Sequence, residues 1–448
     1  MMPTANRPDL VIRNGRIVTA DARGTVLDGG ALLIAGSRIA AVTAAGDPRI
    51  DAAVAAGAQV IDAGGGFVLP GLINTHTHFG MTLFRGTADD RDLQGFLAAV
   101  WPLEEAFVTP ANVRLGASIA IAESLQAGVT TAADMYFYPE VSAQVAAELG
   151  FRLINGPTLI NGLTAEHDDF DAAFAAARNW LAEHEPGLAL RPSICPHSTY
   201  TLTEPQLLRV AALGAEFDAL VQIHAAENAG EIAQVADQHD ATPIEVMQRT
   251  GILEGNVLLA HAVHLTDSDL DLIEDRFERS RGLAHCPASN MKLASGVARV
   301  PEILARGIAL GLGTDGPASS NDLDLFLAMR LSGMLHALTS GPGSVPARAL
   351  VEMATIGGAR ALGIDHLTGS LEAGKLADVV ILDGSTPLAV GADPFSTLVY
   401  SLGRAEVRTV LVDGVVRVRD GAVVGADPAA LHDEAAALYA QYPVPKLS

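Results

Sequence analysis

The sequence predicts an α/β protein whose main domain is a (β/α)8 TIM barrel, joined to a small β-sandwich domain built from both chain ends. Between about residues 70 and 370, short apolar runs alternate with amphipathic helical patterns, which is the rhythm of parallel βα units. On either side, short β-rich runs are separated by turn dipeptides. We therefore expect a sandwich from residues 1–69 plus 371–427, a barrel over 70–370, and a C-terminal helix and tail over 428–448.

The two flanking blocks are predicted to be hairpins. Each contains dipeptides whose first residue tolerates positive φ and whose second is glycine, as two-residue hairpin turns require. These dipeptides are Asn14-Gly15, Asp413-Gly414 and Asp420-Gly421. Neither block has enough strands to bury a face alone, so we expect the two blocks to pair with each other.

The middle of the chain contains eight strand candidates. Helical patterns such as ANVRLGASIAIAESLQAG and TEPQLLRVAALGAEF lie between them. Eight βα units over this length fit a closed barrel better than an open sheet. The strand candidates are GLINTHTH, residues 130–136, 151–156, 188–198, 219–227, 257–265, 281–290 and 308–316.

Composition restricts the class of partner. The 448 residues are 49% hydrophobic and carry a net charge of −23, which repels phosphate backbones and anionic lipids. The sequence therefore predicts a small-molecule substrate, with no nucleic acid and no membrane as partner, and leaves a homo-oligomer open. The N-terminus lacks the apolar core of a signal peptide, and the two cysteines, Cys195 and Cys286, form no disulfide framework, so we expect a cytoplasmic protein with both thiols buried.

Histidines gather at the predicted strand ends, where a barrel of this kind carries its chemistry. His76 and His78 stand two residues apart on one strand, so they point to the same face. They are either two ligands of one metal ion or a pair of hydrogen-bonded core histidines. Seven of the thirteen histidines occupy such positions: His76, His78, His197, His224, His261, His264 and His285.

Residues at later strand ends favour the metal. His224 and Glu227 follow the fifth strand, and Asp315 closes the eighth in GLGTDG. A carboxylate after so apolar a strand is costly to bury unless it binds a cation or a proton donor, although Asp315 alone would also suit a helix cap. Three histidines and an aspartate leave one position open for water, as in catalytic zinc sites. No lysine lies between 188 and 198 to bridge two ions, which favours one metal ion.

Taken together, these motifs resemble the amidohydrolase superfamily. GLINTHTH, DMYF, PHSTY, HAAE, AHAVHL, AHCPASNMKL and GTDGPASSNDLDLF occur in the family's order over nearly the whole chain. The chain is similar to the mononuclear subgroup that contains S-adenosylhomocysteine and 5'-methylthioadenosine deaminases, guanine deaminases and triazine hydrolases. The resemblance implies that His76, His78, His224 and Asp315 hold one divalent metal ion, usually zinc, with iron(II) as the alternative.

The resemblance also implies catalytic and substrate-binding roles. Glu227 matches the acid that takes a proton from the attacking water and passes it to a ring nitrogen. His261 matches the residue that holds the attacking oxygen, and Asp315 would also relay a proton to departing ammonia. Glu104 matches a glutamate that binds ribose hydroxyls, unless it merely begins an exposed helix, and His197 matches a histidine that binds a purine nitrogen.

The function implied is hydrolytic removal of an exocyclic amino group from an adenosine-like nucleoside. The arginines that hold an amino-acid carboxylate in homocysteine-type substrates have no counterpart in Asn155-Gly156-Pro157, which favours a neutral derivative. The alternatives are deamination of guanine, pterin or aminotriazine rings, triazine dechlorination, and a non-catalytic scaffold. The scaffold is disfavoured because the complete ligand set is present.

Overall fold

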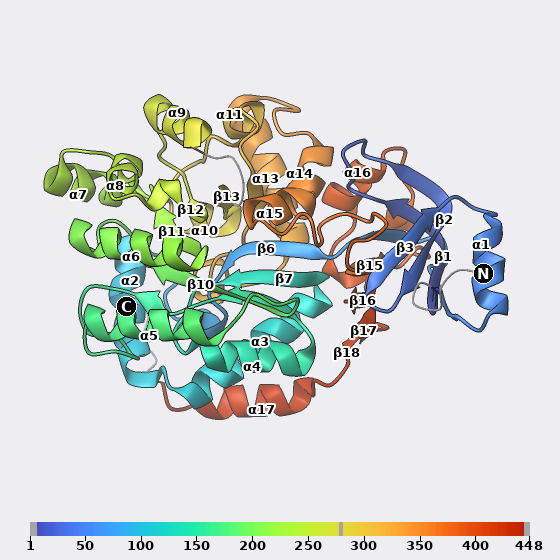
Figure 1. Cartoon of the computed structure of the whole chain (residues 1–448), viewed down its shortest axis with the longest axis horizontal. Helices are drawn as coiled ribbons and strands as arrows, with labels where there is room; N and C mark the ends of the chain where they lie inside the picture. Colours follow the sequence, from blue (N-terminus) through green and yellow to red (C-terminus); the bar gives the residue numbers. More distant parts are fainter. Residues whose placement is uncertain (1–6, 277–280, 443–448) are drawn as a thin grey trace.

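The computed structural model describes residues 7–276 and 281–442, and in these residues the strands form two sheets. Figure 1 shows a barrel surrounded by helices and, beside it, a smaller unit in which the blue N-terminal strands lie next to the red C-terminal ones. The predicted (β/α)8 barrel with a small β-domain from both chain ends is confirmed. The domain boundaries themselves stay a prediction.

The barrel strands are parallel and follow one another around the sheet in chain order. Across the seam between the last strand and the first, the Asp315 amide donates to the His76 carbonyl at 3.0 Å. Each predicted strand is found, and a short β9 (Thr158–Leu159) pairs with the fourth. The barrel strands are β6 (Leu72–Thr77), β7 (Val129–Asp134), β8 (Arg152–Asn155), β10 (Leu190–Pro196), β11 (Leu220–Ala225), β12 (Val257–His261), β13 (Arg281–His285) and β14 (Leu310–Leu312).

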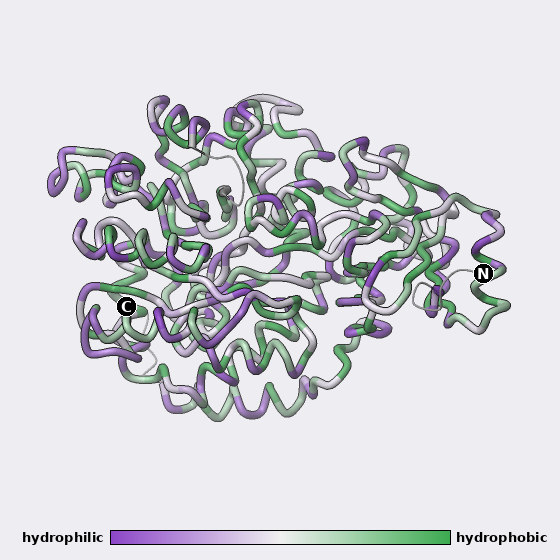
Figure 2. The backbone as a smooth tube through the Cα atoms, viewed as in Figure 1, coloured by the Kyte–Doolittle hydropathy of each residue, from purple (hydrophilic) through white to green (hydrophobic). Residues whose placement is uncertain are grey.

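Helices surround the barrel and begin at residues suited to N-caps. Thr109 accepts a hydrogen bond from the Asn112 amide, and Thr203 forms a capping box with Gln206. Figure 2 shows hydrophilic and hydrophobic colours alternating along peripheral helices, as expected when one face of a helix is buried. The helices are α2 (Leu93–Phe107), α3 (Pro110–Gln126), α4 (Pro139–Leu149), α5 (Phe170–Glu183), α6 (Glu204–Phe217), α7 (Ala229–His239), α8 (Pro243–Arg249), α9 (Asp267–Arg276), α10 (Pro287–Lys292), α11 (Val300–Ala305), α12 (Pro317–Ser320), α13 (Leu325–Ser340), α14 (Ala347–Met353) and α15 (Ile356–Ala361), with the short η2 (Phe79–Phe84) and η3 (Ile252–Glu254).

The second sheet is mixed and joins both chain ends. Its centre is the antiparallel pair β15 and β5, in which Val380 lies opposite Leu69. The strands are β1 (Leu10–Val18), β2 (Val26–Ala35), β3 (Arg38–Thr43), β4 (Gln59–Asp62), β5 (Phe67–Pro70), β15 (Val379–Leu382), β16 (Val407–Val412), β17 (Val415–Arg419) and β18 (Ala422–Val423). The flanking helices are α1 (Pro48–Ala55), η4 (Pro387–Ala389), α16 (Pro394–Ser396), η5 (Thr397–Ser401), η6 (Arg404–Glu406) and α17 (Pro428–Tyr439).

One predicted turn is wrong. Asn14 and Gly15 form no hairpin, because β1 runs through them and pairs along its length with β2. Asn14 has a φ of 57°, and the pairing register shifts beside Gly15, so the dipeptide makes a β-bulge. Positive φ is needed for both structures, which is why the dipeptide alone did not distinguish them.

The two Asp-Gly dipeptides do form turns, as predicted. Asp413 and Gly414 connect β16 to β17, and Asp420 and Gly421 connect β17 to β18. All four residues have positive φ, between 50° and 78°. Two-residue hairpin turns of this conformation match the twist of the strands they join.

A buried ion pair ties the barrel to the mixed sheet. Arg152 of β8 is 4% exposed and binds Asp378, which is 1% exposed, and Asp413. The α17 helix crosses back to the barrel, where the Tyr439 hydroxyl donates to the Thr82 carbonyl at 3.1 Å. Among the described residues, no helix has the length and apolar character needed to cross a membrane.

Candidate active site

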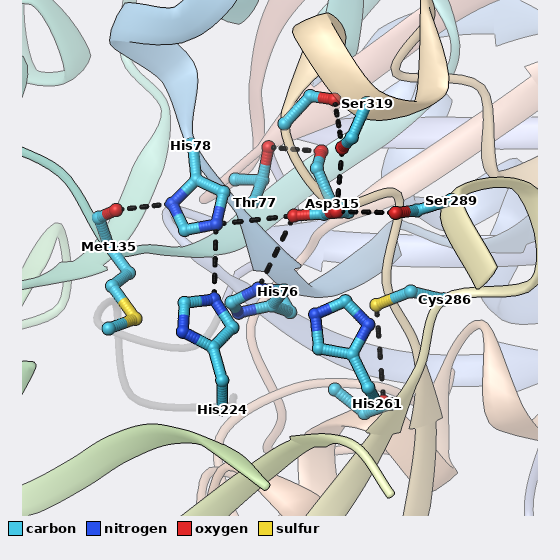
Figure 3. Close-up of polar contacts among 12 residues, drawn as sticks. His76, Thr77, His78, Met135, His224, His261, Cys286, Ser289, Asp315 and Ser319 are labelled. Carbon is cyan, nitrogen blue, oxygen red and sulfur yellow. Dashed lines mark hydrogen bonds and ion pairs between the residues drawn. The ribbon is translucent and has the colours of Figure 1, made fainter. Parts of the chain in front are cut away.

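The four predicted metal ligands converge at the C-terminal end of the barrel (Figure 3). Asp315 Oδ1 lies 3.5 Å from His76 Nε2 and 3.2 Å from His78 Nε2. His224 Nε2 lies 3.3 Å from His78 Nε2. The ligand atoms of His76, His78 and Asp315 all lie within 4.8 Å of one another, as do those of His76, His224 and His261.

The Nε2 lone pairs of His78 and His224 face each other, because the Nδ1 atom of each ring makes a hydrogen bond to a backbone carbonyl. His78 Nδ1 donates to the Met135 carbonyl, and His224 Nδ1 donates to the His197 carbonyl at 2.7 Å. In the neutral imidazole, this leaves each Nε2 with a lone pair and no proton. Two such atoms 3.3 Å apart repel one another unless a cation or a shared proton lies between them.

His76 is the most enclosed member of the cluster. It is 0% exposed, and neither of its ring nitrogens makes a hydrogen bond among the described residues, although Asp315 Oδ1 lies 3.5 Å from Nε2. Burial lowers the pKa of His76 to about 4, which keeps the ring in the neutral form that binds metals. A Cβ added at Gly313 would lie 3.0 Å from His76 Cβ, so β14 approaches β6 closely at this point. This donor set fits one divalent cation.

Asp315 is held by two serines. Ser289 Oγ and Ser319 Oγ each donate to Asp315 Oδ2 at 2.6 Å, while Oδ1 faces the histidines. Asp315 has a φ of 62°, a conformation that L-residues rarely adopt outside functional or turn positions. Asp315 is the N-cap of neither described helix that follows it: Gly316 is the N-cap of α12 and Asp324 that of α13. The helix-cap alternative for Asp315 is therefore wrong.

Glu227 and His261 lie close to each other, and the His261 ring lies beside that of His224. Glu227 is 6% exposed, and burial raises its pKa. Its Oε1 lies 4.0 Å from His261 Nε2, and Asn290 Oδ1 accepts a hydrogen bond from His261 Nδ1 at 2.9 Å. The buried Glu231 accepts hydrogen bonds from the Glu227 amide at 2.6 Å and the Ala226 amide at 3.1 Å, which fixes the backbone that carries Glu227.

The cluster opens into a cavity that contains both predicted substrate-binding residues. Glu104 lies near the end of α2 and is 9% exposed, so it does not begin an exposed helix, and that alternative is wrong. Burial lowers the pKa of His197 to about 3, so its ring is neutral. The other lining residues are mostly apolar and aromatic and include Leu93, Phe96, Leu97, Val100, Trp101, Met135, Tyr136, Phe137, Ile160, Tyr200 and Leu293.

Two strand-end histidines lie outside the cluster. His264 Nε2 binds the Ser295 carbonyl at 2.6 Å, and His285 Nε2 lies 3.5 Å from His336 Nε2 on α13. Both cysteines are buried free thiols, as predicted. Position at a strand end was therefore necessary but not sufficient for a histidine to reach the cavity.

The residues that orient the cluster were not predicted. Ser289, Ser319, Asn290 and Glu231 each bind one of the named site residues. Ser289 and Asn290 belong to the motif AHCPASN, and Ser319 to GTDGPASS, so both motifs had been noted without a role for these side chains. Their polar character immediately after apolar strands was the available signal.

Comparison with known proteins defines the class. Residues 67–417 match the amidohydrolase family, so the chain belongs to that family. The prediction of a hydrolase that acts on carbon–nitrogen bonds is confirmed, and with it the resemblance.

Individual relatives narrow the comparison. The chain is 40% identical to a 5-methylthioadenosine/S-adenosylhomocysteine deaminase of Desulforudis audaxviator over 82% of this chain and 85% of that protein. It is 39% identical to a 5'-deoxyadenosine deaminase of Methanothermobacter thermautotrophicus over 81% of this chain and 84% of that protein. The structure of an adenosine deaminase from Xanthomonas campestris with bound zinc superposes with a TM-score of 0.91, at 32% identity, covering 97% of this chain and 98% of that one.

Proposed function

We propose that the protein is a metal-dependent deaminase that replaces the exocyclic amino group of an adenosine-like nucleoside by oxygen. Water and the nucleoside give the corresponding oxo compound and ammonia: one C–O bond forms and one C–N bond breaks. The observation that carries the proposal is one cavity lined by His78, His224 and Asp315 of the cluster, by Glu227, and by the two polar residues Glu104 and His197. The names of the relatives support it.

We propose His76, His78, His224 and Asp315 as the residues that hold the ion, with zinc as the ion in the cell and iron(II) as the alternative. A divalent ion at such a site polarises water, so that hydroxide is available near neutral pH. Ser289 and Ser319 keep Asp315 Oδ1 turned toward the histidines by binding Oδ2. The carbonyls of Met135 and His197 fix the tautomers of His78 and His224.

Glu227 is proposed as the proton shuttle. Its carboxylate takes a proton from the attacking water and delivers it to the ring nitrogen beside the reacting carbon, which draws electron density from that carbon. Burial raises the pKa of Glu227, as suits a group that must both accept and donate at neutral pH. His261, oriented by Asn290, holds the attacking oxygen through Nε2. Asp315 passes the second proton to the departing ammonia.

Glu104 and His197 are proposed to select the nucleoside. His197 Nδ1 lies 3.2 Å from both Ser198 Oγ and Thr201 Oγ1, which fixes the ring beside the cluster and leaves Nε2 for a purine nitrogen. A carboxylate such as Glu104 accepts two hydrogen bonds from the vicinal hydroxyls of a ribose.

The 5'-substituent is proposed to be uncharged. The described residues that line the cavity include neither arginine nor lysine. A second hollow shares Trp101, Phe137 and Ile160 with this cavity. Its described lining residues include the exposed Glu105 but no arginine or lysine. The carboxylate of an amino-acid tail would lose hydration here without gaining a cationic partner. This favours 5'-methylthioadenosine or 5'-deoxyadenosine over S-adenosylhomocysteine.

The test is ammonia release by the purified, zinc-loaded protein from 5'-methylthioadenosine, 5'-deoxyadenosine, adenosine, guanine and an aminotriazine. The Glu227→Gln variant is the control for contaminating deaminases. The proposal expects the adenosine derivatives to give the highest kcat/KM. Turnover of guanine or the triazine alone would reject the proposal and would indicate a deaminase that acts on a different ring by the same hydrolytic reaction.

A further inference from the structure

Glu104 is held by a tyrosine. The Tyr136 hydroxyl donates to Glu104 Oε1 at 2.7 Å, and the two side chains are buried, with exposures of 5% and 9%. Among the described residues this is the only hydrogen bond made by the Glu104 carboxylate. Tyr136 comes two residues after the end of β7 and lines the same cavity as Glu104. A buried carboxylate with a single donor depends on that donor for its orientation.

The surroundings of Tyr136 are shaped to its ring. A Cβ added at Gly80 would lie 2.2 Å from Tyr136 Cδ1 and 2.3 Å from Cε1, so no other residue fits there without displacing the ring. Gly80 lies within η2 and does not have positive φ, so the requirement is one of space and not of backbone conformation. Phe137 also packs near the Tyr136 ring, with ring centroids 5.2 Å apart.

The same short segment also orients a proposed metal ligand. The Met135 carbonyl accepts the hydrogen bond of His78 Nδ1, and the next residue, Tyr136, lies beside the His78 ring with centroids 6.4 Å apart. Met135 and Tyr136, two adjacent residues after β7, therefore fix the distance between the Glu104 carboxylate and the His78 ring. A shift in Tyr136 moves Glu104 relative to His78.

We propose that Tyr136 is a positioning residue for ribose recognition: its hydroxyl holds Oε1 of Glu104 in place, so that the carboxylate meets the two ribose hydroxyls without first being ordered by them. This inference rests on the proposed function. Each carboxylate oxygen has two lone pairs, so Oε1 can bind Tyr136 and a ribose hydroxyl together, and Oε2 stays available for the second hydroxyl. Preorganisation of this kind strengthens binding of substrate and transition state alike.

The test compares adenosine with 2',3'-dideoxyadenosine in the zinc-loaded full-length protein. Tyr136→Phe is expected to raise KM for adenosine by about tenfold with kcat changed less than about threefold, as for loss of an interaction made equally in ground and transition states. For 2',3'-dideoxyadenosine the KM is expected to stay within about twofold. In a Glu104→Ala background, which lacks the oxygen that Tyr136 contacts, Tyr136→Phe is expected to raise the KM for adenosine by less than about a further threefold, because the two residues act through one contact.

Tyr138→Phe is the matched control. It makes the same chemical change, loss of a tyrosine hydroxyl, two residues further along the chain. The Tyr138 hydroxyl donates to the Ala165 carbonyl at 3.0 Å and not to Glu104. The ratio of kcat/KM for the two nucleosides should stay at its wild-type value in this variant. Gly80→Ala is the second variant, in case Tyr136→Phe does not fold, and it should lower the preference for adenosine by displacing the Tyr136 ring.

The outcomes separate this inference from the proposed function. Suppose that the wild type deaminates adenosine but Tyr136→Phe lowers kcat/KM equally for both nucleosides, or lowers it by the same factor whether or not Glu104 is present. The positioning role of Tyr136 is then wrong, and the proposed deaminase function is unaffected. Retention of the full adenosine preference in a folded Tyr136→Phe or Gly80→Ala protein also overturns it. If the wild type deaminates none of the adenosine derivatives, 5'-methylthioadenosine and 5'-deoxyadenosine included, the proposed function fails and the role of Tyr136 fails with it.

Discussion

His224 Nε2 and His78 Nε2 approach to 3.3 Å although the Nδ1 atom of each ring already donates its proton to a backbone carbonyl. The two rings come from β11 and from the end of β6, so opposite parts of the barrel bring two lone pairs together. A stable protein does not hold such an arrangement in its core without a cation or a shared proton to offset the repulsion. Asp315 Oδ1, 3.2 Å from His78 Nε2, adds the negative charge that favours a divalent cation.

Metal content tests this arrangement directly. The purified protein is expected to contain about one equivalent of zinc or iron, and His224→Ala less than about a third of an equivalent, because a mononuclear site loses most of its affinity with one ligand. His264→Ala is the matched control, because His264 also stands at the end of a barrel strand, just after β12, but binds the Ser295 carbonyl instead. Elemental analysis gives the result. Two tightly held ions in the wild type would contradict a mononuclear site.

Replacing Glu227 tests the proton shuttle. Glu227→Gln keeps the size of the side chain but cannot accept a proton, so kcat for an adenosine derivative is expected to fall by about 10² to 10⁴. The metal content should stay near the wild-type value. Steady-state kinetics and elemental analysis on the same sample separate loss of the base from loss of the ion. A loss of less than about tenfold would remove Glu227 from this role.

The buried Glu104 predicts a pH-dependent cost in stability. Burial raises the pKa of Glu104 to about 7 from an ordinary value of 4.5, so the folded protein binds more protons than the unfolded chain between these pH values. The free energy of unfolding therefore falls as pH rises through this window. Glutamine does not titrate, so Glu104→Gln should stabilise the protein relative to wild type by on the order of 2 kcal/mol more at pH 8 than at pH 4.5.

Chemical denaturation of the metal-free protein at the two pH values measures this difference. The exposed Glu105 is adjacent on the same helix, so Glu105→Gln is the matched control for loss of one negative charge from α2. A difference between Glu104→Gln and wild type that is the same at both pH values would mean that Glu104 is ionised equally in the folded and unfolded states.

The charge of the 5'-substituent gives a fourth prediction. The kcat/KM for 5'-methylthioadenosine is expected to exceed that for S-adenosylhomocysteine by at least about tenfold, because no described residue lining the cavity offers an arginine or lysine side chain to the amino-acid carboxylate. Ile160→Arg places a guanidinium at the edge of the cavity and should narrow this ratio. Competition between the two substrates, followed by separation of the products, measures it. Equal kcat/KM in the wild type would show that the tail is bound elsewhere.

Much of the fold was predictable because it depends on local patterns. Apolar runs of strand length alternating with amphipathic helices require parallel βα units, and each predicted barrel strand is found. The error at Asn14 and Gly15 has a local cause too: a bulge and a tight turn both need positive φ, and only the pairing of β1 with β2 distinguishes them.

The site was predictable in its chemistry but not in its supports. His76, His78, His224 and Asp315 stand at strand ends in motifs that can be read from the sequence, and the fold brings them together. The contact of Tyr136 with Glu104 spans 32 positions, and no local pattern links a tyrosine after one strand to a glutamate near the end of a preceding helix.

The sequence by itself determined the barrel, the two-ended sheet and the set of residues able to hold a metal, because periodicity and motif order are properties of the chain. Only the tertiary structure decided which histidines face the cavity, which carbonyls and serines orient them, and that Glu104 is buried against Tyr136. These depend on how strands and helices far apart in sequence pack. His264 and His285 follow the same strand-end rule as His224, but packing gives them other partners.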